Sequence, residues 1–361
     1  MSYYRKGKIT SFRLLVLAVC AMVLLFGVEW SKTIEKDPTL DDKITAAKLM
    51  EKALVVIKRE RLKMGIAIDP QNDPNETGMI GLDYTDLTTT TGSLSSKRTS
   101  TNPNFAGIVV EMMCKAGVKS GDDVAISFSG SFPALNIAIL SAVHTLRLNP
   151  VILSSVGASM YGANDPRLTW LDMERITREN GIWPYASKAA SLGGIMETGG
   201  GLDKKGIEMG LEAIRRNDVA YLDEQGIKTL QSDIERRLTI YEKALGGRKP
   251  AAFINTGGSS TSLGNSPETY SLSYGLLSKI PFSNHPERGI IFRMAERGIP
   301  VIHLLNIKKI ASRFGLPVDP VPLPFVPSGG VMEPQRYSFP LALSSLILLS
   351  LIIAITRDRK I

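Results

Sequence analysis

The stretch that decides the fold, residues 123–136, reads DVAISFSGSFPALN. Its first half, 123–129, is a short apolar run, which is typical of a strand buried on both faces of a sheet. Pro133 suits the first turn of a helix, which we predict over 134–147. A second apolar run predicts a strand at 151–156. Strand, glycine-containing loop, helix and strand in this order indicate a βαβ unit.

The same alternation continues on both sides of this unit. Further strands are predicted at 79–90, 189–193, 251–255 and 301–305. Further helices are predicted at 104–116, 168–180, 203–216, 229–245, 286–297 and 307–314. This pattern favours an α/β domain over 79–315 with a mainly parallel, doubly wound, Rossmann-like sheet. A charged helix at 44–63, within the segment 31–78, is interpreted as a stalk, and the proline-rich segment 316–338 as a linker.

Two apolar runs flank this domain. Residues 14–30 and 339–355 are almost free of charge, so we predict that both cross a lipid bilayer as helices. Basic residues lie outside both runs, in the tails 1–13 and 356–361. The positive-inside rule then places both tails in the cytoplasm and the domain outside the cytoplasmic (inner) membrane. A cleaved signal peptide at the N-terminus and a buried helix at the C-terminus are the alternatives.

The charge distribution argues against a nucleic-acid-binding protein. The chain has 43 Lys and Arg residues against 35 Asp and Glu residues. Four of the basic residues precede the first apolar run and three follow the second, so the domain between them is nearly neutral. The two cysteines, Cys20 and Cys114, form no CxxC pair and offer no disulfide framework.

Glycine- and serine-rich loops follow several of the predicted strands. In an open parallel sheet, ligands bind beyond the carboxyl ends of the strands, near a reversal of strand order. We therefore predict a ligand pocket formed by Ser129, Gly130, Ser131, Asn136, Gly157, Ser159, Asn164, Asn255, Gly257 and Gly258. No loop matches a Walker motif, GxGxxG or GxSxG, and we expect no cofactor.

An enzymatic interpretation of these loops needs a nucleophile, a base and an orienting acid. The candidates for these roles are Ser131 (or Ser129) as the nucleophile, His303 as the base and Asp172 (or Glu174) as the acid. The competing interpretation is a histidine with satisfied hydrogen bonds at a strand end and an aspartate in the first turn of a helix. Three scattered histidines give no zinc site, and we predict no metal. A carboxylate-only Mg²⁺ site at Asp83, Asp165 and Asp172 is the alternative.

Six motifs suggest a family. They are TSTNPNFA (99–106), SGSFPALN (129–136), SVGAS (155–159), TWLDME (169–174), IPVIHLL (299–305) and GLPVDP (315–320). Together they resemble the poly-gamma-glutamate system proteins, which are bacterial membrane proteins associated with poly-γ-glutamate capsule synthesis and export. The resemblance covers nearly the whole chain and includes both apolar ends. It implies synthase and export membrane subunits as partners, together with the lipid bilayer, and it assigns no catalytic residue.

Three functional hypotheses are compatible with these patterns. The first is a non-enzymatic accessory subunit of poly-γ-glutamate synthesis or export. It would contact the polymer through loop N–H groups and side chains such as Lys97, Arg98 or Arg167. An alternative is an extracytoplasmic serine-dependent hydrolase or transferase that acts on the polymer, and another is a scaffold that retains a small-molecule-binding fold. We favour the first because no catalytic motif is complete.

Overall fold

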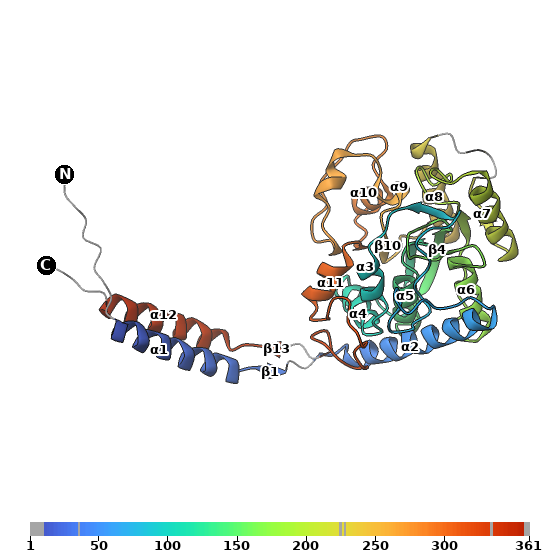
Figure 1. The fold of residues 1–361 in the computed structure, drawn as a ribbon. Helices are drawn as coiled ribbons and strands as arrows, with labels where there is room; N and C mark the ends of the chain where they lie inside the picture. Colours follow the sequence, from blue (N-terminus) through green and yellow to red (C-terminus); the bar gives the residue numbers. More distant parts are fainter. Residues whose placement is uncertain (1–10, 35–36, 224–225, 227–228, 333–334, 357–361) are drawn as a thin grey trace, which may run out of the picture. The chain divides into compact units, whose positions relative to one another are not determined.

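The computed structural model describes residues 11–34, 37–223, 226, 229–332 and 335–356 (Figure 1). The chain forms two compact units. One contains the two ends of the chain, before residue 38 and after residue 332, and the other contains residues 38–332. The predicted cytoplasmic tails, 1–13 and 356–361, lie largely outside the described residues.

The globular unit, residues 38–332, is built on a seven-stranded, mostly parallel sheet, which confirms the predicted α/β class. In chain order, its strands are β3 (Asp123–Ser129), β4 (Asn149–Ser155), β8 (Ala189–Ser191), β9 (Ala220–Tyr221), β10 (Ala252–Thr256), β11 (Gly275–Leu276) and β12 (Val301–Leu304). Their spatial order is β11-β12-β10-β3-β4-β8-β9, and β11 alone runs antiparallel to its neighbour. The chain builds outward from β3 to β9 and then returns to the other side of β3. This reversal creates a switch point between β3 and β10.

Helices cover both faces of the sheet. Successive residues of a strand point to opposite faces, so Ile126 belongs to one buried hydrophobic cluster and Ala125 to the other. The first cluster includes residues of α2 (Leu40–Lys63), α4 (Phe105–Lys115), α5 (Pro133–Thr145), α6 (Trp170–Glu179), α7 (Lys204–Arg216) and α11 (Ile307–Arg313). The second includes residues of α8 (Leu230–Ala244) and α10 (Ile290–Glu296). Short elements complete the unit: β2 (Thr88–Thr90), α3 (Leu94–Ser100), β5 (Ala158–Ser159), β6 (Asn164–Asp165), β7 (Leu168–Thr169), α9 (Ser260–Leu263) and the 3-10 helix η1 (Pro267–Ser271).

The strand predicted at 79–90 is shorter in the structure, where only β2 is a strand. A side chain holds the preceding segment instead. The Asn164 Oδ1 atom accepts a hydrogen bond from the Leu82 N–H at 2.9 Å, and its Nδ2 donates to the Leu82 carbonyl at 2.8 Å. The asparagine therefore satisfies backbone groups that a neighbouring strand would otherwise pair.

The helix that the sequence places in a stalk, α2, is part of the globular unit. Ala47 and Met50 are fully buried, and the helix packs against α4 and α5. Near the start of α2, the buried Lys43 amine donates to Glu111 of α4 at 2.6 Å and to the Val331 carbonyl at 3.0 Å. Apolar packing and a buried ion pair on the same face of the helix therefore both fix α2 to the body.

The proline-rich segment predicted as a linker is also bonded to the globular unit as far as residue 332. The Arg98 guanidinium donates to the Asp319 carboxylate at 2.6 Å. The Asn104 Nδ2 atom donates to the Phe325 carbonyl at 3.0 Å. Residues 316–332 therefore lie against the globular unit and form part of it.

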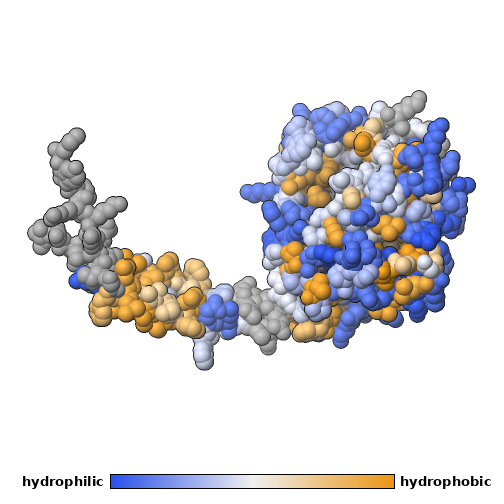
Figure 2. Space-filling view, viewed as in Figure 1, coloured by the Kyte–Doolittle hydropathy of each residue, from blue (hydrophilic) through white to orange (hydrophobic). Residues whose placement is uncertain are grey.

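The unit formed by the chain ends contains two apolar helices, α1 (Ser11–Trp30) and α12 (Phe339–Thr356). They lie side by side (Figure 1), and the adjoining strands β1 (Thr33–Ile34) and β13 (Gln335–Arg336) pair antiparallel. The stretch Phe12–Trp30 of α1 is long and apolar enough to cross a membrane, whereas α12 is apolar but shorter. Hydrophobic residues cover both helices in the view of Figure 2.

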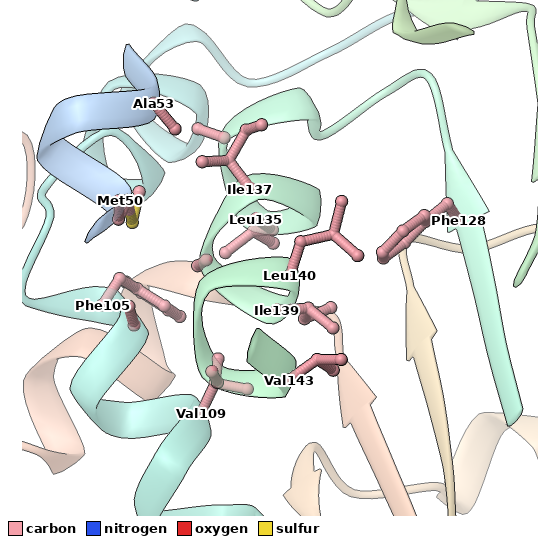
Figure 3. Close-up of a cluster of buried hydrophobic side chains, with 14 of the residues drawn as sticks. Met50, Ala53, Phe105, Val109, Phe128, Leu135, Ile137, Ile139, Leu140 and Val143 are labelled. Atoms are coloured by element: carbon pink, nitrogen blue, oxygen red, sulfur yellow. The ribbon is translucent and has the colours of Figure 1, made fainter. Parts of the chain in front are cut away.

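The larger hydrophobic cluster surrounds α5. In Figure 3, the side chains of Leu140 and Phe128 face one another between α5 and β3, and Met50 and Phe105 lie on the other side of α5. Leu140 is fully buried. The helix is therefore enclosed between the sheet and the helices α2 and α4.

We expect Leu140→Ala to lower the free energy of unfolding by about 2–5 kcal/mol, because it leaves a cavity in a close-packed core. Chemical denaturation of the full chain in detergent, followed by tryptophan fluorescence, measures this change. Val55→Ala, at a position 61% exposed on α2, is the control and should change it by less than about 0.5 kcal/mol. Equal effects of the two substitutions would contradict the described packing.

Candidate functional site

A pocket of about 470 Å³ lies at the carboxyl edge of the parallel sheet. Residues at or just beyond the ends of β3, β4, β8, β10 and β12 line it, together with the segment from Thr89 to Ser93 and Lys97 of α3. The strands β3 and β10 flank the switch point, where the chain leaves the sheet in opposite directions. The pocket therefore occupies the place at which a doubly wound sheet opens to a ligand.

Half of the predicted binding residues line this pocket, namely Ser129, Ser131, Gly157, Ser159 and Gly258. Most of the lining residues are serine, threonine or glycine. Gly157 is required by close packing, because a Cβ atom there would lie 2.6 Å from the Leu192 carbonyl oxygen. Small residues thus keep the pocket open and leave backbone groups accessible.

The other five predicted residues are Gly130, Asn136, Asn164, Asn255 and Gly257, and they do not line the pocket. The buried Asn136 Nδ2 donates to the Ser129 carbonyl at 3.0 Å, and its Oδ1 accepts from the Thr256 hydroxyl at 2.9 Å. Asn136 therefore ties the ends of β3 and β10 together. Asn164 holds the segment before β2, as described above.

Two of these five are glycines whose backbone conformation matters. Gly257 follows β10 with φ +76°, a conformation that favours glycine. At Gly130, a Cβ atom would lie 2.5 Å from the Val156 carbonyl oxygen. Both residues therefore shape the loops that surround the pocket.

Lys97 is the principal charged group of the pocket. Its side chain is 2% exposed, and its Nζ donates to the Ser159 Oγ at 2.7 Å and to the Ser131 carbonyl. The amine also lies 3.8 Å from the centroid of the Phe132 ring. In the described part of the chain, no carboxylate pairs with it. Burial without a counter-charge lowers the pKa of Lys97 to about 7.

An acidic residue of the pocket, Glu197, already has partners. Its Oε2 atom accepts from the Ser191 hydroxyl at 2.7 Å and from the buried Arg237 guanidinium at 3.2 Å. Arg237 also pairs with Asp233 at 3.1 Å. The charge of Glu197 is therefore compensated by Arg237, and no contact among the described residues pairs it with Lys97.

The three residues proposed as a catalytic triad have different hydrogen-bond partners. The Ser131 Oγ accepts from the Ser159 N–H at 2.9 Å. The buried His303 Nδ1 lies 3.0 Å from the Asn255 Nδ2, and burial lowers the pKa of the imidazole to about 4. His303 therefore has the character of a structural histidine at a strand end. No hydrogen bond among the described residues joins it to Ser131.

Asp172, the third residue of that set, stabilises the start of α6. Its carboxylate accepts from the Thr169 N–H at 2.7 Å and from the Arg216 Nε at 2.9 Å. The neighbouring Asp165 pairs with Arg167 at 2.8 Å. Over the described ranges, no cluster of three or more His, Cys, Asp or Glu side chains could hold a metal ion.

The predicted strand-end loops contain some of the other lining residues, such as Ser155 and Ser259, but sequence patterns did not indicate the segment before α3, or Glu197, as part of the pocket. The sequence predicts a strand up to residue 90 and assigns no element to residues 91–93, and Glu197 lies six residues beyond the end of β8. Lys97 was named only as a possible contact of the polymer. Its burial could not be inferred, because a lysine before an arginine in a serine-rich stretch is typical of an exposed surface.

No protein-family model matches the sequence, and comparisons with curated proteins and with solved structures give no significant match. The function of the chain is therefore inferred from the geometry of the pocket and from the residues themselves.

We expect Lys97→Met to change how stability depends on pH. The pKa of Lys97 is about 7 in the folded chain and 10.5 for an ordinary lysine, so the unfolded chain binds more protons between these values. Stability of the wild type should therefore rise, relative to the variant, from pH 7 to pH 10. Denaturation of both chains across this range measures the difference.

Lys119→Met is the control for this titration, because Lys119 is an exposed lysine just before β3, at the opposite edge of the sheet. A difference between wild type and Lys97→Met that stays constant from pH 7 to pH 10 would contradict the burial of an unpaired amine.

Proposed function

We propose that the chain is a membrane-anchored accessory subunit of a poly-γ-glutamate synthesis or export system, and that its pocket binds carboxylates of the polymer. The observation that carries this proposal is the buried Lys97 amine, which lines the pocket and lacks a carboxylate partner in the described structure. The six sequence motifs support the choice of system.

A carboxylate is the ligand group that would compensate the charge of the Lys97 amine. Removing an ammonium group from water is costly unless an opposite charge compensates it. A carboxylate placed against Lys97 would supply that charge and would favour the protonated amine. Hydroxyl groups of Ser129 and Ser155 line the same pocket and can donate to its second oxygen atom.

Poly-γ-glutamate presents such groups at regular intervals. Joining glutamate residues through the γ-carboxyl group leaves one α-carboxylate free on each residue. The cavity of about 470 Å³ falls within the range of small-molecule pockets, roughly 300–1,000 Å³. It therefore suits a short stretch of the polymer rather than its whole length.

The hairpin of α1 and α12 supports anchoring at both ends of the chain. An α-helix rises about 1.5 Å per residue, so the 18 residues of α12 reach roughly 27 Å, close to the ~30 Å of a hydrocarbon core. Slight thinning of the bilayer accommodates this mismatch. With basic residues beyond both helices, the proposed topology has cytoplasmic termini and an extracytoplasmic globular unit.

We expect γ-linked glutamate oligomers to bind the full chain in detergent and Lys97→Met to weaken binding about tenfold or more, because it removes a charge-assisted hydrogen bond worth about 1.5–3 kcal/mol. Isothermal titration calorimetry measures the affinity. Binding should also weaken as pH rises through about 7, because the amine loses its proton.

Two controls accompany this titration. Lys119→Met should bind as the wild type does, and oligomers with amidated carboxylates should bind weakly to both chains. Equal binding of the oligomer by Lys97→Met and by the wild type would refute the assignment of the pocket.

The proposed topology predicts that Tyr270, which is 96% exposed, is accessible from outside the cytoplasmic membrane. In a variant without Cys20 and Cys114, Tyr270→Cys should react with a membrane-impermeant maleimide in intact spheroplasts. Ser2→Cys, in the N-terminal tail, should react only after lysis. The reverse pattern would place the globular unit in the cytoplasm.

A further inference from the structure

The pocket contains a serine hydroxyl in direct contact with its buried amine. The Lys97 Nζ atom lies 2.7 Å from the Ser159 Oγ, and both residues line the cavity. Both side chains are buried, with 6% of Ser159 exposed. A serine next to an amine that can lose its proton is one of the known arrangements for activating a hydroxyl nucleophile.

We propose that Ser159 and Lys97 form a nucleophile and general-base dyad, which gives the pocket an acyl-transfer activity toward amide or ester bonds. The proposal goes beyond polymer binding. It takes only its substrate class, the γ-glutamyl amide, from the proposed function, and its chemistry depends on the dyad alone.

The environment of Lys97 favours the base role. A general base works best when its pKa lies near the working pH, and burial brings the pKa of this amine to about 7. Near neutral pH, neutral and protonated forms are both populated. The protonated form suits a bound carboxylate, whereas the neutral form can accept the Ser159 proton.

Neighbouring groups orient both members of the dyad. The Ser131 carbonyl accepts one N–H of Lys97, and the protonated amine also donates to the Ser159 Oγ. Once the amine is neutral, the same 2.7 Å contact can reverse, so that the Ser159 hydroxyl donates to the nitrogen lone pair. The Ser131 Oγ accepts from the Ser159 N–H at 2.9 Å and so fixes the backbone of the nucleophile. Ser131, the sequence-based candidate for the nucleophile, is thus a positioning residue.

Gly92 leaves room beside the nucleophile. A Cβ atom at this position would lie 3.2 Å from the Ser159 Oγ and would also clash with the Met160 carbonyl oxygen. The absence of a side chain at Gly92 therefore keeps one side of the hydroxyl free for an approaching carbonyl group.

The proposed reaction balances without an added reagent other than water. Neutral Lys97 takes the proton of Ser159 as the Oγ atom attacks the carbonyl carbon, and the C=O π electrons move to oxygen. Collapse of the tetrahedral adduct breaks the C–N bond, and the leaving amine takes the proton from Lys97. Water, or another amine, then gives a proton to Lys97 and attacks the ester, and Ser159 recovers its proton as the ester bond breaks.

The test is labelling of the full chain in detergent by a fluorophosphonate, which reacts with activated serines, followed by mass spectrometry of the labelled peptide. We expect the label on Ser159, at a rate that rises as pH increases through about 7. Lys97→Met and Lys97→Arg should slow labelling by roughly 10²–10⁴-fold, because neither side chain can act as a base. Ser159→Ala should abolish it.

Ser312→Ala is the control, because Ser312 is an exposed serine of α11 that does not line the pocket, and this variant should be labelled as the wild type is. No label on Ser159, label on another serine, or a rate that does not change between pH 6 and pH 9 would overturn the proposal. The pH profile needs only the wild type, so it decides even where a variant does not fold.

Oligomer binding and Ser159 labelling are measured separately, so failure of the proposed function can be distinguished from failure of the dyad. Oligomer binding by calorimetry with no label on Ser159 would leave the proposed function standing and remove the dyad. Label on Ser159 without oligomer binding would keep the dyad and remove the γ-glutamyl substrate. A chain that passes both tests should release shorter γ-glutamyl oligomers, and Ser159→Ala should not.

Discussion

A buried ring of hydrogen bonds joins the ends of β3 and β10, and the pocket depends on it. The Thr256 hydroxyl accepts from the Ser129 N–H at 3.1 Å and donates to the Asn136 Oδ1, whose Nδ2 returns to the Ser129 carbonyl. The two strands diverge into loops on opposite sides beyond this point. Where the two strands separate, their backbone N–H and carbonyl groups can no longer pair with one another. The ring supplies partners for the N–H and the carbonyl of Ser129. The opening at the switch point can therefore be rigid as well as polar.

Lys97 is buried in this pocket without an acidic partner among the described residues. An amine in this position destabilises the fold unless its donors are satisfied, and the Ser131 carbonyl, the Ser159 hydroxyl and the Phe132 ring satisfy them in part. Natural proteins hold such unfavourable groups mainly at functional sites. Glu197, which also lines the pocket, is paired with Arg237 at 3.2 Å. The described contacts thus leave the Lys97 amine without a counter-charge.

Local patterns predicted the sheet well and the pocket in part. The apolar run at 123–129 coincides with β3, and the glycine-rich loops lie at the carboxyl edge, because strand length and loop composition are local properties. The position of α2 in the core was missed because its many charges suggested an exposed helix, whereas Lys43 is buried against Glu111, 68 residues away. Lys97 and Ser159 are 62 residues apart, so no spacing along the chain indicates their contact.

Under the proposed function, the buried Lys97 amine would bind the polymer through one carboxylate at a time. The nearly neutral globular unit provides no broad field to attract a polyanion, so long-range electrostatics contribute little. A buried pair is screened less by salt than a surface pair, but forming it requires both groups to lose water. Under the proposed function, each carboxylate would therefore bind selectively and only moderately tightly. On a polymer with many identical units, a released carboxylate is replaced by its neighbour at high local concentration. A long polymer would then stay bound while its position in the pocket changes. A site with high affinity for a single unit would prevent this movement.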